Sequence, residues 1–194
     1  MLYGLEVMRV QKIVAINGSP RAQGSTAALV DAILKGAGEK GAQVKTYNVN
    51  TMSIKGCQSC YACKTQGHCV LQDDMQELYE EIATAGGIIF ATPVYMWQMT
   101  AQLKLAVDRL YPFLKPDYSS YLTPGKKVLL AVTQGRPDTS MFHHYFEHMG
   151  KTLSFLGFGD YKILIAGGTR KPEDLLSQPT VVAEARQLGG WLAE

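Results

Sequence analysis

Lys12-Ile-Val-Ala-Ile-Asn-Gly-Ser-Pro-Arg-Ala-Gln-Gly-Ser-Thr26 is the stretch of sequence that decides the fold. Its first five residues form a short apolar run, which is typical of a buried strand. Asn17 to Pro20 predict a turn, and Ser25 or Thr26 is expected to cap the helix that follows. A buried strand that leads through a loop into a helix is the opening unit of an α/β domain.

The rest of the chain repeats this strand–helix alternation. Further apolar runs predict strands at residues 44–49, 87–91, 127–132 and 161–166. Helical patterns begin at Asp73 and then cover residues 100–110, 142–156 and 181–192. Five apolar strands that alternate with five helices predict one parallel sheet between two helical layers. We expect the strand order 2-1-3-4-5, which puts the ligand-binding switch point between the first and third strands.

Composition limits the function classes that need to be considered. The 194 residues are 46% hydrophobic and 19% charged, which suits one domain spanning residues 1–194. Residues 1–10 predict an N-terminal extension without the pattern of a signal peptide. The net charge of +2 gives no electrostatic reason to expect a nucleic-acid or membrane partner. No apolar run approaches the ~20 residues that span a bilayer, so we expect a cytoplasmic protein.

The loop at residues 18–26 is suited to a terminal phosphate group. It matches neither the Walker loop nor the Gly-x-Gly-x-x-Gly fingerprint. Backbone amides at the start of the helix favour an anion. The candidate phosphate-binding residues supply hydroxyls, amides or a cationic contact, and they are Ser19, Arg21, Gly24, Ser25, Thr26 and Ala27. The alternative is that Ser25 and Thr26 only cap the helix.

A second loop, at residues 91–97, follows the third predicted strand. A flavin ring needs a flat apolar slot with backbone groups at its polar edge. This loop offers a stiff turn and polarizable side chains through Pro93, Val94, Tyr95, Met96 and Trp97. The alternative for Tyr95 and Trp97 is ordinary packing in the core or between subunits.

The two loops together carry a family resemblance. Asn17-Gly-Ser-Pro-Arg-x-x-Gly-Ser-Thr26 resembles the phosphate loop of the flavodoxin-like NAD(P)H-dependent FMN reductase family, with Ser25 where that family often has Asn. Residues 91–97 and the helical motif Leu103-Lys104-x-x-x-Asp108-Arg109 resemble its second signature, and Lys104 and Asp108 are spaced to pair on one helix face. The resemblance extends over residues 12–166 and is strongest in the two loops.

The resemblance implies a flavodoxin-like three-layer fold, bound FMN and NAD(P)H as co-substrate. It also implies that a third loop lies beside the flavin ring, at Thr133, Gln134 and Gly135. Members of the family are commonly dimers or tetramers, so we expect a homodimer or homotetramer. Four aromatic residues either serve such a contact or pack within the monomer, namely Tyr111, Phe113, Tyr118 and Tyr121.

All four cysteines of the chain lie in a loop at residues 50–72, which shows neither helical nor strand periodicity. A disulfide framework normally spreads its cysteines along the chain, so this crowding favours a metal, a cluster or a redox role. The motif Cys57-x2-Cys60-x2-Cys63-x5-Cys69 resembles the iron–sulfur flavoprotein branch of the same family, which implies a [4Fe–4S] cluster. Bacterial ferredoxin runs differ, with a shorter last gap followed by proline. Zinc, a disulfide and free thiols remain alternatives.

One further motif is weighed and set aside. His144-Tyr-Phe-Glu-His148 fits the H-x-x-E-H pattern of some zinc peptidases. The chain offers no obvious third ligand, so we interpret His143, His144 and His148 as partly exposed helix residues. A role for His143 or His144 beside the cofactor stays open.

Two functions of different classes remain. The first is an enzyme that oxidises NAD(P)H and reduces a small acceptor such as a quinone, free flavin or an oxygen species. The second is an electron-transfer flavoprotein that works with a ferredoxin-type partner, and a flavin-binding regulator is a weaker third reading. Hydride passes directly between nicotinamide and flavin, so the sequence assigns no catalytic side chain. Nothing in the sequence selects the acceptor.

Overall fold

Three central strands are buried along nearly their whole length in the computed structural model, which describes residues 10–194. They are β1 (Lys12–Asn17), β3 (Gly87–Pro93) and β4 (Lys127–Thr133). The edge strands are β2 (Gln43–Asn48) and β5 (Tyr161–Ala166), which are more exposed. Every pairing is parallel, and the order β2-β1-β3-β4-β5 confirms the sequence prediction. Apart from Val10, the expected extension at residues 1–10 lies outside the described part of the chain.

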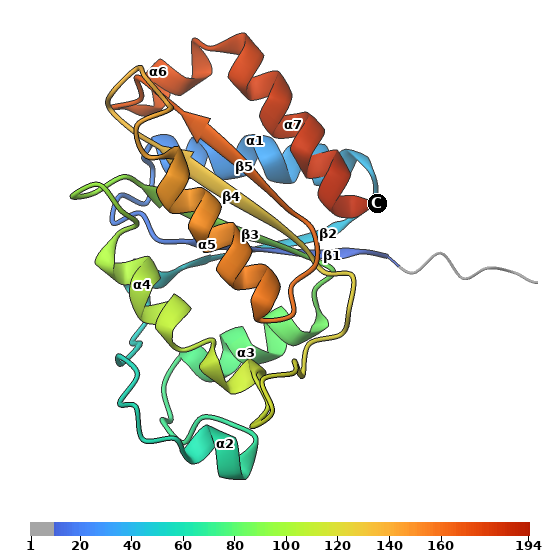
Figure 1. Cartoon of the computed structure of the whole chain (residues 1–194). Helices are drawn as coiled ribbons and strands as arrows, with labels where there is room; N and C mark the ends of the chain where they lie inside the picture. The colour runs from blue at the N-terminus through green and yellow to red at the C-terminus, as the bar shows by residue number, and fades with distance from the viewer. Residues whose placement is uncertain (1–9) are drawn as a thin grey trace, which may run out of the picture.

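Helices cover both faces of this sheet, as predicted (Figure 1). The helices are α1 (Ser25–Glu39), α2 (Ala62–Gln66), α3 (Met75–Thr84), α4 (Ala101–Asp108), α5 (His143–Phe155), α6 (Pro172–Leu176) and α7 (Pro179–Ala193). Two short 3-10 helices are η1 (Val49–Thr51) and η2 (Tyr111–Phe113). The prediction of five helices was therefore wrong, because α2 and α6 have only five residues each and are too short to show a helical period.

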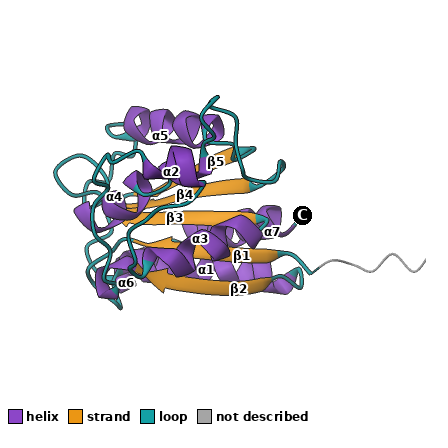
Figure 2. Ribbon diagram, turned by 90° about the horizontal axis from the view of Figure 1, so that it is seen from below, coloured by secondary structure: helices purple, strands orange, loops and turns teal. Residues whose placement is uncertain are grey.

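The two faces of the sheet have separate apolar cores. One lies between the sheet and α3, α4 and α5, and the other lies between the sheet and α1 and α7. Figure 2 shows α3, from the layer formed by α3, α4 and α5, in front of the sheet. The short helix α2 lies beyond this layer, away from the sheet (Figure 1). The cysteine loop is therefore an addition to the outside of a regular three-layer sandwich.

The helices α1 and α7 approach closely because each presents glycine to the other. A Cβ atom on Gly189 would clash with the carbonyl oxygen of Ile33 in α1. Gly36 faces the carbonyl oxygen of Arg186 in the same way. Neighbouring Gly190 has more room, since its nearest atom would be Lys40 Cε at 3.6 Å. The contact thus needs glycine at one position of α7 and tolerates a side chain at the next.

We predict opposite effects of alanine at these adjacent glycines. Gly189→Ala should lower the free energy of unfolding by about 1–3 kcal/mol, because the added methyl overpacks the helix contact. Gly190→Ala is the matched control and should be neutral or stabilising by roughly 0.5–1 kcal/mol through helix propensity. Urea unfolding of the two variants measures both values. Equal stability of the two variants would contradict the packing described for α1 and α7.

Candidate functional site

A pocket of about 280 Å³ lies at the carboxyl edge of the sheet, where four parallel strands end. The loops that follow β1, β3, β4 and β5 all contribute to it. Its lining residues are Ser19, Arg21, Gly24, Ser25, Thr26, Pro93, Val94, Tyr95, Thr133, Gln134, Gly135, Thr169 and Arg170. The structure therefore brings together three loops that the sequence analysis selected separately.

Hydrogen bonds extend the strand pairing into these loops. Gly18 N donates to Ala91 O at 2.8 Å, and Val94 N donates to Thr133 O at 2.8 Å. The buried hydroxyls of Thr26 and Thr133 share a hydrogen bond of 2.7 Å. The walls of the pocket are thereby fixed relative to one another before any ligand binds.

The loop between β1 and α1 is shaped by its own side chains. Asn17 Oδ1 accepts from Ser19 N at 2.9 Å, and Ser19 Oγ accepts from Arg21 N at 3.2 Å. The Ser19 hydroxyl therefore takes part in a hydrogen bond within the turn, and Ser19 also lines the pocket. Arg21 Nη1 reaches across to the carbonyl oxygen of Arg170, at 2.9 Å.

Two buried side-chain oxygens of the pocket have no hydrogen-bond partner among residues 10–194. They are Ser25 Oγ and Gln134 Oε1. The orientation of Gln134 is fixed, because its amide nitrogen donates to Arg136 O at 3.0 Å and to Asp138 O at 2.6 Å. Buried polar atoms are rarely left unpaired, since each costs about 1–3 kcal/mol. The two oxygens therefore indicate a polar ligand.

The expectation that Ser25 or Thr26 caps α1 was wrong. Gly24 occupies the N-cap position in an extended conformation, and no side chain makes the cap hydrogen bond. Ser25 and Thr26 are instead the first residues of the helix itself. The backbone N–H groups of a first helical turn lack partners within the helix, and the helix dipole makes that end positive. No acidic residue lies in the first turn of α1, so the pocket is suited to an anion.

Three predicted cofactor residues lie outside the pocket lining, namely Ala27, Met96 and Trp97. Met96 and Trp97 form the tip of a small hairpin, in which Tyr95 and Gln98 pair with N–O distances of 3.0 and 3.1 Å. Both tip residues have positive φ, 44° and 69°, a conformation that favours glycine. They are 77% and 62% exposed, so this strained tip presents apolar surface beside the pocket.

Thr169 and Arg170 are pocket residues that the sequence analysis missed. Both follow β5 in the segment Gly167-Gly-Thr-Arg170. Thr169 N donates to Gln134 O at 2.9 Å, which brings this segment against the β4 loop. The only sequence indication was their position after the fifth strand, at the same edge as the other loops.

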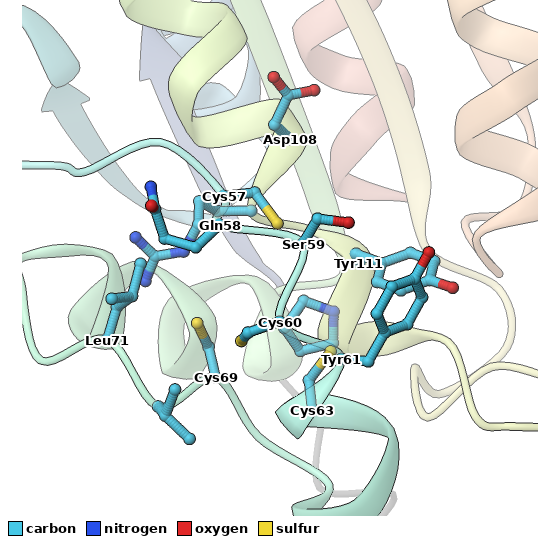
Figure 3. Close-up of a pocket in the computed structure, with 13 residues that line it drawn as sticks. Cys57, Gln58, Ser59, Cys60, Tyr61, Cys63, Cys69, Leu71, Asp108 and Tyr111 are labelled. Carbon is cyan, nitrogen blue, oxygen red and sulfur yellow. The ribbon is translucent and has the colours of Figure 1, made fainter.

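The four cysteines line a second pocket, of about 500 Å³. Figure 3 shows the sulfur atoms of Cys57, Cys60, Cys63 and Cys69 around a common space. All four are free thiols, and Cys57 and Cys60 are exposed. Burial raises the pKa of the Cys63 thiol. Residues 50–72 were predicted to be a loop throughout, but the structure differs. The 3-10 helix η1 overlaps the start of this segment, and the short helix α2 lies within it.

Left-handed turns shape the cysteine segment. Ser59 and Tyr61 have positive φ of 50° and 58°, and Tyr61 is the N-cap residue of α2. Lys64 Nζ then donates to Tyr111 O at 3.0 Å and to Leu114 O at 2.6 Å, and its ammonium lies 3.6 Å from the centre of the Tyr111 ring. These contacts hold α2 against η2.

Comparisons with known proteins show the family of the chain. The profile of the family described as NADPH-dependent FMN reductase matches residues 11–161. The chain belongs to this family. The matched region includes the loops after β1, β3 and β4 and the whole cysteine segment.

Two relatives of this FMN reductase family member are named iron-sulfur flavoproteins. An iron-sulfur flavoprotein from Methanocaldococcus jannaschii is 29% identical over 188 residues, which cover 94% of this chain and 96% of that protein. An iron-sulfur flavoprotein from Methanosarcina thermophila is 42% identical over 98 residues, 50% of this chain and 51% of that protein. The chain thus spans about half the length of the Methanosarcina relative.

Solved structures confirm the flavodoxin-like fold of this family member. An NAD(P)H:quinone oxidoreductase from Methanothermobacter marburgensis superposes with a TM-score of 0.73 at 17% sequence identity. The superposition covers 96% of this chain and 98% of that one. Within residues 10–194, no helix is long and apolar enough to cross a membrane.

The remaining sequence interpretations have mixed outcomes. Lys104 and Asp108 do form the predicted ion pair. His143, His144 and His148 are exposed on α5. Among residues 10–194, no group of three or more His, Cys, Asp or Glu is placed to hold a metal ion, and this includes the four cysteines. Of the four aromatic residues considered for a subunit contact, Phe113 is buried in the core, Tyr111 is half-buried, and Tyr118 and Tyr121 are exposed.

Proposed function

We propose that this chain binds FMN and transfers electrons from NAD(P)H or a reduced carrier protein to a small acceptor. The observation that carries the proposal is the pair of buried, unpartnered oxygens, Ser25 Oγ and Gln134 Oε1, in a pocket at the positive end of α1. Family membership supports the same cofactor and the same class of reaction.

The phosphate of FMN would lie at the start of α1. The hydroxyls of Ser25 and Thr26 and the first backbone amides of the helix supply neutral donors, and Arg21 and Arg170 line the same pocket with positive charge. Gln134 Oε1 can only accept a hydrogen bond, so it is suited to a hydroxyl of the ribityl chain rather than to the phosphate. The residues of this pocket therefore fit the phosphate group and the ribityl chain of FMN.

The flavin ring would lie against the loop after β3. Tyr95 lines the pocket and is 42% exposed, and the apolar hairpin tip at Met96 and Trp97 stands beside it. An open shelf of this kind leaves one side of a ring accessible to nicotinamide and acceptor. Bound FMN would supply both hydride acceptance and single-electron transfer, while the protein contributes position and environment.

We further propose that the cysteine pocket holds a [4Fe–4S] cluster on Cys57, Cys60, Cys63 and Cys69. The support is that all four thiols line one pocket and none forms a disulfide. Zinc on the same four thiolates is the alternative, and metal analysis of the purified protein distinguishes it from a cluster. A cluster is a larger core, whose thiolate ligands stand further apart.

The acceptor is proposed only by class. The exposed, apolar hairpin tip beside Tyr95 favours a quinone, because an apolar surface suits a flat, uncharged ring better than it suits a charged acceptor. The alternative is an electron-transfer flavoprotein that works with a ferredoxin-type partner. Steady-state oxidation of NADH or NADPH with added quinone separates the two, because the alternative predicts turnover only with a reduced ferredoxin.

Ser25→Glu is predicted to abolish FMN binding. A carboxylate about 4 Å from the phosphate costs on the order of 4 kcal/mol at an effective dielectric constant near 20, or about a thousandfold in Kd. Titration of the purified, flavin-free variant with FMN, followed by flavin fluorescence, measures the change.

Thr123→Glu is the matched control for this experiment. Thr123 is exposed and lies ahead of β4, at the opposite edge of the sheet, so the variant adds the same charge away from the pocket. It should bind FMN like the wild type. Unchanged affinity of Ser25→Glu would contradict the assignment of the phosphate site.

Anaerobically purified wild-type protein is predicted to contain about four iron atoms and four acid-labile sulfides per chain. Replacing any one of the four cysteines by serine should reduce the iron content strongly, since thiolate ligands are lost, while FMN stays bound in the separate pocket. His148→Ala should leave the iron content unchanged. Wild-type protein with FMN but without iron and sulfide would remove the cluster from the proposal.

A further inference from the structure

Both ends of the cysteine segment are held by one side chain. Arg109 Nη1 donates to the carbonyl oxygen of Lys55, which precedes Cys57, and to Asp73 Oδ2, which follows Cys69; both distances are 2.7 Å. Arg109 Nη2 donates to Asp73 Oδ1 at 3.1 Å. Asp73 Oδ2 also accepts from Lys55 N at 3.0 Å. All four cysteines therefore lie in a loop closed by the Lys55–Arg109–Asp73 bridge.

The bridge is buried, although the loop that it closes is largely exposed. The side chains of Arg109 and Asp73 are 1% and 4% exposed. Burial alone would lower the pKa of Arg109, but the hydrogen bonds to Asp73 and Tyr79 outweigh it and leave the pKa raised. The Tyr79 hydroxyl accepts from Arg109 Nε at 3.3 Å and donates to Arg109 O at 2.7 Å. The guanidinium is thus charged and fixed in orientation.

The cationic side of this ion pair faces the thiols. Arg109 is among the residues that line the cysteine pocket, whereas Asp73 is not. An arginine has five N–H donors, and hydrogen bonds within residues 10–194 use four of those on Arg109. One Nη2 hydrogen remains for a group in the pocket. Four thiolates around a metal core carry net negative charge, so this placement is electrostatically favourable.

We propose that Arg109 is a positioning residue of the cysteine site, which fastens both ends of the loop at residues 55–73 and sets a cation against the anionic group held there. The identity of that group as an iron–sulfur cluster rests on the function proposed above; the fastening of the loop does not. A buried ion pair that merely stabilises the core would act on the whole fold equally, and this difference makes the proposal testable.

The experiment compares Arg109→Gln and Arg109→Lys with the wild type, as full-length, FMN-loaded protein purified anaerobically. Hydrogen exchange followed by mass spectrometry reports the loop at residues 55–73 separately from the sheet. Iron and FMN per chain and the midpoint potential of the iron centre are measured on the same samples. Lys126→Met is the control, because Lys126 is also a buried cation, bound to Ala83 O at 2.7 Å, but lies at the opposite edge of the sheet.

Arg109→Gln should speed exchange in residues 55–73 by about tenfold or more and leave exchange in β1, β3 and β4 unchanged. Iron retention should fall on the order of tenfold, as it does when groups that orient metal ligands are removed, while FMN per chain stays constant. Any remaining centre should have a more negative midpoint potential. Arg109→Lys keeps the positive charge but loses the planar, forked donors of the guanidinium. Compared with Arg109→Gln, it should therefore bring the midpoint potential closer to the wild-type value than it brings the hydrogen exchange of residues 55–73.

Unchanged exchange in the loop of Arg109→Gln would overturn the proposal. Faster exchange spread evenly over the chain would overturn it too, because that is the pattern expected of the control Lys126→Met. If Arg109→Gln does not fold, Asp73→Asn weakens the same bridge and should give the same local pattern. Wild-type protein with FMN but no iron would remove the proposed cluster, and the exchange measurement would still decide whether Arg109 fastens the loop.

Discussion

Parallel pairing of β3 with β1 on one side and with β4 on the other is the constraint on which the rest of the structure depends. Because neighbouring strands run in the same direction, the loops after β1, β3, β4 and β5 all emerge at one edge of the sheet. Hydrogen bonds such as Gly18 N to Ala91 O continue the pairing beyond the strands. A Cβ atom on Gly18 would lie 2.8 Å from Thr100 Oγ1, so this loop needs glycine to approach α4. The pocket is a direct consequence of this arrangement.

The electrostatic environment at the same edge of the sheet favours an anion. The first turn of α1 lines the pocket through Ser25 and Thr26 and carries no acidic side chain, and Arg21 and Arg170 line the same pocket. Ser25 illustrates the link between local structure and function. Since Gly24 takes the N-cap position, the Ser25 hydroxyl is left without a partner, and a residue that could have stabilised the helix is available for a ligand.

Local patterns were sufficient for the strands and for the loops after β1 and β3, because apolar runs and loop chemistry lie within a few neighbouring residues. The strand order was expected from the general topology of doubly wound sheets, and the loop after β4 was selected through the family resemblance. Features that depend on distant residues could not be predicted in this way. Arg170 joins the pocket only because β5 ends at the same edge as β4. Arg109 looks like one more charged residue on a helix, and its burial depends on Asp73, 36 positions away. The helices α2 and α6 have five residues each, too few to show a period.

The central claim is that this edge of the sheet recognises the phosphate of a flavin nucleotide. The most direct test is to titrate the flavin-free protein with FMN and, separately, with riboflavin, which has the same ring and ribityl chain but no phosphate. The account predicts that FMN binds more tightly by about a hundredfold or more, because charge-assisted contacts to the phosphate are absent with riboflavin. Equal affinities for the two compounds would contradict it.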